Sequence, residues 1–119
     1  MFNHATTPEE FETLWKTAQL AAQTAAVLQN DKLGDENHRG FDCGFAWVTL
    51  PGTGKFANWA KKKGIASKGY PTGLTIWYSK LHSLPTQSVS VHEAAARAAR
   101  DVLAHGLQSS QIGYSSRLD

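Results

Sequence analysis

The chain has 119 residues, of which 41% are hydrophobic and 10% aromatic, and a formal charge of +2. This length corresponds to one domain, residues 1–119, and this hydrophobic content excludes a disordered chain. The single cysteine excludes an intramolecular disulfide framework. Because no signal peptide and no apolar run of roughly 20 residues is visible, we expect a cytoplasmic protein with no membrane partner.

The first predicted helix covers residues 7–30. Thr7 and Glu10 form a Thr-x-x-Glu capping box around Pro8, which suits the first helical position. Apolar residues then recur every three or four positions and indicate one buried stripe: Phe11, Leu14, Trp15, Ala18, Ala22, Ala25 and Leu28. The following segment, residues 31–42, is polar and without a period, so it predicts a mobile loop.

An α/β core is predicted over residues 43–119. The apolar run 44–50 has the length and composition of a strand in the middle of a sheet. After a Pro-Gly turn, Thr53 caps a short helix that continues to Lys63 and stops at Gly64.

Two more strands and one more helix complete the predicted order. Residues 74–79 alternate, with Leu74, Ile76 and Tyr78 on one side and Thr75, Trp77 and Ser79 on the other. A second capping box, Ser90 with Glu93, begins a helix that ends at Gly106. Residues 111–118 alternate again and predict a last strand at the sheet edge.

The order α-β-α-β-α-β predicts an α/β fold, with α+β as the alternative. We expect a single two-layer sandwich of about three strands and three helices, with the helices mainly on one face of the sheet. In that arrangement either Trp77 or Tyr78 lies on the open face. An exposed ring there would mark a nucleic-acid platform or a homodimer contact.

Charge is distributed unevenly along the chain. Residues 1–42 carry seven acidic residues against three basic ones, whereas the fifty residues from Cys43 to His92 contain six lysines and no acid. Lysines beside aromatic rings suit an anionic partner that combines phosphates with bases. The candidate ligand-binding residues are Lys55, Lys61, Lys62, Lys63, Lys68, Tyr70, Trp77 and Arg117.

Each of these candidates also has a simpler interpretation. The turn before Lys55 resembles a phosphate-binding loop but fails its pattern at Thr49 and Phe56, so it can be a plain turn and helix cap. The lysine triplet 61–63 can be a solvated helix end. Tyr70 can cover the core, and Arg117 can pair with the C-terminal carboxylate.

Catalytic and metal sites are not predicted. His38, Asp42 and Cys43 are close in sequence, but a nucleophilic cysteine needs a base held against it and a metal needs three or four ligands. The other histidines lie in separate elements without chelating spacing. We therefore expect no catalytic residues, no metal and no cofactor, and we expect Cys43 to be a small buried residue.

Three motifs carry a resemblance to a known family. They are Cys43-Gly44-Phe45-Ala46-Trp47-Val48, then Gly54-Lys55-Phe56-Ala57-Asn58-Trp59, and finally Ser115-Ser116-Arg117-Leu118-Asp119. Over residues 41–119 the chain resembles a family of small, uncharacterised proteins encoded by tailed bacteriophages. It departs from that family at residues 70–73, where the family has an aromatic residue followed by two glycines. The resemblance supplies no activity and no catalytic residues, but it implies a bacterial host's cytoplasm, with nucleic acid or a host component as partner.

The leading hypothesis is a non-enzymatic phage-type binding protein. Its basic, aromatic central segment would engage a nucleic acid or a nucleotide-like anion. The alternative is an interaction protein that binds and inhibits a host bacterial protein, or that self-associates through an apolar face. The least favoured alternative is an enzyme that uses Cys43 and a histidine.

Overall fold

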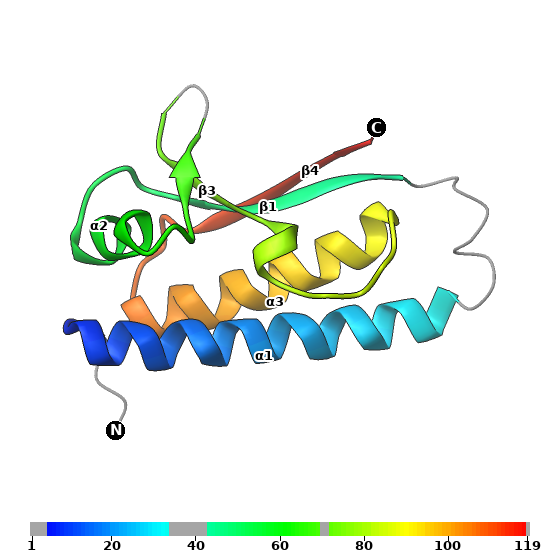
Figure 1. Cartoon of the computed structure of the whole chain (residues 1–119), viewed down its shortest axis with the longest axis horizontal. Helices are drawn as coiled ribbons and strands as arrows, with labels where there is room; N and C mark the ends of the chain where they lie inside the picture. The colour runs from blue at the N-terminus through cyan, green and yellow to red at the C-terminus, as the bar shows by residue number, and fades with distance from the viewer. Residues whose placement is uncertain (1–4, 34–42, 70–71, 119) are drawn as a thin grey trace.

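The computed structural model describes residues 5–33, 43–69 and 72–118, and these residues form a mixed α/β fold (Figure 1). The predicted fold class is therefore confirmed. The elements follow one another as α1 (Pro8–Leu33), β1 (Gly44–Leu50), α2 (Lys55–Lys62), β2 (Ser67–Lys68), β3 (Leu74–Trp77), the 3-10 helix η2 (Tyr78–Lys80), α3 (Val89–Leu107) and β4 (Gly113–Leu118).

The start of α1 has the predicted capping box. The Thr7 hydroxyl accepts a hydrogen bond from the Glu10 backbone N–H (3.2 Å), and the Glu10 carboxylate accepts from the N–H groups of Thr6 and Thr7. These bonds to the charged form, from Thr6 first, lower the pKa of Glu10. The helix continues to Leu33 instead of ending at residue 30, and the rest of the predicted mobile loop, residues 34–42, lies outside the described residues.

The predicted caps of the other two helices are wrong. The α3 helix begins after Ser88, whose hydroxyl accepts from the Val91 N–H (3.4 Å), because Ser88 has an extended backbone and Ser90 is already helical. The α2 helix begins after Gly54 and not Thr53, without any side-chain cap.

The sheet has four antiparallel strands in the order β2-β3-β1-β4. The prediction that β1 lies in the middle and β4 at an edge is confirmed. The fourth strand, β2, was missed because its two residues are too short to show a period. It is closed against β3 by a turn in which the Gly69 N–H donates to the Gly73 carbonyl (2.8 Å), and Gly73 has a φ of 81° that favours glycine.

One face of the sheet is covered by α3, and α1 lies along α3 (Figure 1). Fully buried alanines allow this close approach: Ala18, Ala22 and Ala26 on α1, with Ala95, Ala96 and Ala99 on α3. The buried stripe of α1 thus ends on Ala26, whereas Ala25 is only partly buried and Leu28 is 64% exposed. None of the described helices is both long and apolar enough to cross a membrane.

Candidate functional site

The sheet has one face against α3 and one face that no described helix covers (Figure 1). Along β1 the residues alternate between buried and half-buried, and Ala46 and Val48 point to the helices while Phe45 and Trp47 point away. On β3, Ile76 is buried and Trp77 is 37% exposed on the same outer side as Trp47. We call this outer side the open face.

Three aromatic rings are in contact on the open face. Trp47 and Trp77 are direct cross-strand partners whose ring centroids lie 5.0 Å apart. Phe45 meets Trp77 edge to face at 6.3 Å. The rings of Phe45, Trp47 and Trp77 therefore form one continuous surface across β1 and β3, which we call the aromatic row.

Arg117 lies at the end of the aromatic row. It is the β4 partner of Phe45 in the register, and its guanidinium carbon lies 5.6 Å from the Phe45 ring centroid. A hollow of about 290 Å³ opens beside it, lined by Phe45, Trp77, Tyr78, Ser79 and Arg117. Among the described residues, the lining thus combines three rings, two hydroxyl groups and one cation, without a carboxylate.

Tyr78 borders the hollow, and its position is fixed by α3 on the buried side of the sheet. Its ring stacks on the ring of His92 in α3, with a centroid distance of 3.7 Å, and lies 6.4 Å from that of Phe45. The sequence alternation predicted that either Trp77 or Tyr78 lies on the open face. Trp77 is the one exposed there, and Tyr78 is half-buried at the border of that face.

A buried histidine pair supports Tyr78. The Leu84 backbone N–H donates to Nδ1 of His82 (3.1 Å), so the His82 proton is on Nε2, which donates to Nδ1 of His92 (2.8 Å). Burial lowers the pKa of His82, which favours this neutral state. Sequence analysis missed the pair, because the ten-residue separation matches no motif and only the turn after η2 brings the rings together.

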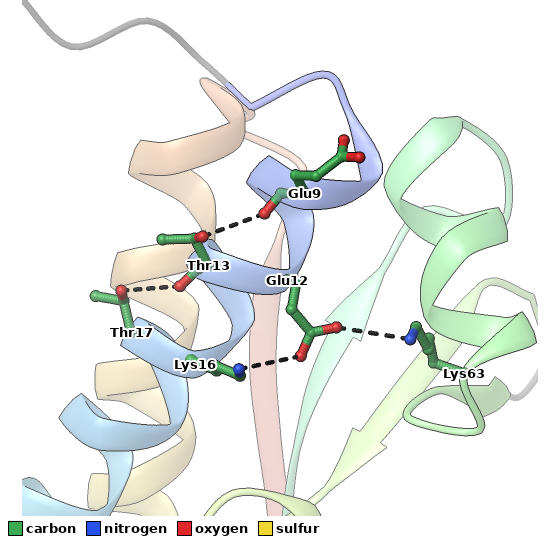
Figure 2. A network of polar contacts seen from close by, with 6 residues as sticks. All are labelled: Glu9, Glu12, Thr13, Lys16, Thr17 and Lys63. Atoms are coloured by element: carbon green, nitrogen blue, oxygen red, sulfur yellow. Dashed lines mark hydrogen bonds and ion pairs between the residues drawn. The ribbon is translucent and has the colours of Figure 1, made fainter.

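The lysine triplet belongs to an element that packs on α1. Lys61, Lys62 and Lys63 are at the end of α2, whose Phe56 packs on Phe11 of α1 with ring centroids 5.4 Å apart. Lys63 is 3.6 Å from the Glu12 carboxylate of α1, as Figure 2 shows. The acid-free run of the sequence hid this partner, because Glu12 belongs to a distant segment.

The remaining candidates are placed singly. Lys68 on β2 is opposite Leu74, so it lies at the sheet edge on the helix side, and Lys55 is the exposed first residue of α2. Tyr70 lies outside the described residues. Of the eight candidates, the structure brings Trp77 and Arg117 together and does not bring the described lysines to them.

Cys43 has no catalytic arrangement among the described residues. It is half-buried and not fully buried as predicted, because it lies just before β1, where it forms an isolated β-bridge with Ser88; His82 and His92 bond to each other. His38 and Asp42 lie outside the described residues. Within the described ranges, no three His, Cys, Asp or Glu residues converge as metal ligands.

Comparisons with protein-family models, curated proteins and solved structures find no match to this chain.

Proposed function

We propose that this is a non-enzymatic, phage-type binding protein that holds single-stranded nucleic acid on the open face of its sheet. The observation that carries the proposal is the aromatic row of Phe45, Trp47 and Trp77, with Arg117 at its end. Bases stack on aromatic side chains with about 1–3 kcal/mol each, whatever their sequence. A guanidinium beside the row offers paired donors for a phosphate.

The ligand is a single strand and not a duplex. A duplex hides the faces of its bases in its own stack, whereas a flexible strand can turn them onto a sheet surface. The hollow between Trp77 and Arg117 adds a place where one base or one phosphate can enter. A mononucleotide presents the same two groups, so it should compete weakly for this hollow.

The lysines of α2 act at longer range in this proposal. Lys61 and Lys62 are exposed, and with Lys55 and Lys68 they raise the positive potential of one end of the molecule. Such charges attract a polyanion before it docks. They should therefore contribute to the salt dependence of binding more than to the stacking contacts.

The phage resemblance supports a binding role at the same place. Phe45 and Trp47 belong to the first motif of that resemblance and Arg117 to the third. These side chains, far apart in sequence, lie on the same face of the sheet.

Fluorescence anisotropy with a labelled ten-nucleotide oligothymidylate tests the proposal. We expect binding that weakens as salt rises and a much weaker signal with the matching duplex. Trp77→Ala should reduce the affinity about 5- to 100-fold, because it removes one stacking surface. Lys61→Ala, the matched surface control, should change affinity less than Trp77→Ala. No binding, or equal loss in the two variants, would reject the open face as the site.

A protein-binding role is the second candidate, favoured by the exposed leucines of α1. Leu20 is 69% and Leu28 is 64% exposed on the helix, which forms one border of the molecule (Figure 1). A contact through such residues would be nearly independent of salt. The same titration series separates it from nucleic-acid binding.

A further inference from the structure

Between the exposed acids Glu9 and Asp31, the outer face of α1 carries a row of uncharged side chains where a surface helix usually carries charged ones. Opposite the buried alanines, five residues follow one another at spacings of four, three, four and three, and we call them the α1 stripe: Thr13, Thr17, Leu20, Thr24 and Val27. All five are exposed, including Leu20 at 69% and Val27 at 38%. This spacing is the one that allows two helices to pack along each other.

Two of the three threonines of the stripe, Thr13 and Thr17, direct their hydroxyl groups to the backbone of the helix itself. The Thr13 hydroxyl donates to the Glu9 carbonyl (3.1 Å) and the Thr17 hydroxyl to the Thr13 carbonyl (2.9 Å), as Figure 2 shows. Both hydroxyl protons are thus satisfied within the helix. Covering these threonines with another helix would leave neither proton without an acceptor.

We infer that the α1 stripe is the docking surface for a second copy of this chain, packed antiparallel across a two-fold axis that crosses the stripe at the level of residue 22. In such a dimer every contact occurs twice, because the two-fold axis exchanges the two copies. It places Leu20 of one copy against Thr24 of the other, and Thr17 against Val27. The larger leucine then meets the smaller threonine at one level, and valine meets a threonine of similar shape at the other, which allows close packing.

Charge complementarity identifies the second copy as the occupant. With about 3.6 residues per turn, Glu10, Leu28 and Lys32 lie on the same side of the stripe, the side toward α3. The antiparallel arrangement brings Lys32 of each copy to within two residues of the level of Glu10 in the other, an offset of about 3 Å along the helix, and the Glu10 side chain is exposed. The charges nearest the stripe on its opposite side, Glu12 and Lys16, already pair with each other at 3.9 Å (Figure 2).

A groove between α1 and α3 provides room for the partner's leucine. It has a volume of about 650 Å³, and its lining includes Thr13, Thr17, Leu14 and Val102 together with the acidic residues Glu9, Glu10 and Asp101. In the antiparallel dimer Leu28 of the second copy falls level with this groove, on the same side. The exposed leucine of one copy and the empty groove of the other therefore fit each other.

The molar mass in solution tests the inference directly. Light scattering after gel filtration, at about 100 μM protein, should give twice the monomer's 13.0 kDa. Leu20→Glu should return the mass to that of the monomer and weaken association at least about 100-fold, because the two-fold axis buries the new charge twice. A wild-type protein that remains monomeric would overturn the inference.

Leu118→Glu is the matched control, because Leu118 is a 67% exposed leucine at the end of the edge strand β4. It should leave the dimer intact. If Leu118→Glu and not Leu20→Glu gave monomers, the copies would meet along β4 and the inference would be wrong. Circular dichroism should show unchanged helix content in both variants, since neither leucine is buried.

Cross-linking tests the orientation. In a Cys43→Ser background, which removes the only cysteine, Leu20→Cys and Thr24→Cys proteins are oxidised separately and as a mixture. The antiparallel dimer predicts several-fold more disulfide in the mixture than in either protein alone. More disulfide in the separate proteins would overturn the antiparallel arrangement. Oligothymidylate binding by Leu20→Glu should remain as in the wild type, so this test fails or succeeds independently of the proposed function.

Discussion

Replacing Gly44 with alanine should destabilise the sheet where β1 and β4 meet. Gly44 is the first residue of β1 and pairs with Leu118. A Cβ atom there would overlap the backbone carbonyl oxygen of Arg117 and lie 3.1 Å from the Cα of Leu118 and from the Cβ of Val89. Two of these three atoms belong to the backbone of β4, so β4 must move away from β1 to make room.

The magnitude follows from what this movement breaks. The end of the β1–β4 ladder would lose one or two hydrogen bonds of about 1 kcal/mol each. Overpacking against Val89 adds a further loss of about 1 kcal/mol. Alanine also makes the unfolded chain less flexible than glycine does, which offsets roughly 0.4–1 kcal/mol of the loss. The net loss is about 2 kcal/mol in the free energy of unfolding. For a domain of this size it lowers Tm by about 8 °C.

Thermal unfolding followed by circular dichroism measures this effect. Gly113→Ala is the matched control, because Gly113 pairs with Thr49 at the other end of the same ladder and its new Cβ would meet only the Thr49 hydroxyl, at 3.1 Å. We expect Gly113→Ala to change Tm by less than about 3 °C. Equal Tm values for Gly44→Ala and the wild type would mean that β1 and β4 do not approach each other this closely at Gly44. Gly44→Ala should also weaken oligothymidylate binding, since it displaces Arg117 from Phe45.

Two further predictions concern stability. Because burial lowers the pKa of His82 in the folded state, the unfolded chain binds a proton there more readily than the folded one. The free energy of unfolding should therefore have its full value above about pH 6.5 and decrease as the pH falls below it. Urea unfolding at pH 7.5 and 5.5 measures this, and equal midpoints would contradict a neutral His82–His92 pair. Ser88→Ala should cost about 1 kcal/mol, because the Val91 N–H loses its cap, whereas a urea midpoint equal to that of the wild type would argue against this helix start.

The parts of the fold that sequence analysis predicted correctly are those with a local cause. The capping box of Thr7 and Glu10 is closed by bonds that span three residues. The alternation of Leu74, Ile76 and Trp77 follows from the geometry of a single strand.

The buried stripe of α1 was only partly predicted, because the choice between neighbouring positions depends on the partner helix. Ala18, Ala22 and Ala26 follow one another at four-residue steps where α1 meets α3. The alternation of three- and four-residue steps instead selected Ala25 and Leu28. Nothing in the α1 segment itself distinguishes Ala26 from Ala25, so this choice could not be made from local pattern.

The candidate site was incomplete for the same reason. Trp77 and Arg117 were proposed from residue type, but Phe45 and Trp47, although they belong to an apolar run and to a motif of the resemblance, were not among the candidate site residues. Their exposure depends on the absence of a described helix over that face, which is a property of the whole chain's topology. A strand with one exposed face usually alternates apolar and polar residues. Since β1 has apolar residues on both faces, its residue pattern did not reveal the open face.

The four tryptophans supply the most direct test of the central claim, that the open face binds single strands. Trp47 and Trp77 lie in the aromatic row, Trp15 is buried in α1, and Trp59 lies beside the lysine triplet, 5.9 Å from the Lys63 ammonium. Two-dimensional NMR resolves one indole N–H signal for each during titration with oligothymidylate. We expect the Trp47 and Trp77 signals to shift while those of Trp15 and Trp59 stay in place. A shift of the Trp59 signal with Trp47 and Trp77 unchanged would mean that the strand binds beside the lysine triplet and not on the open face.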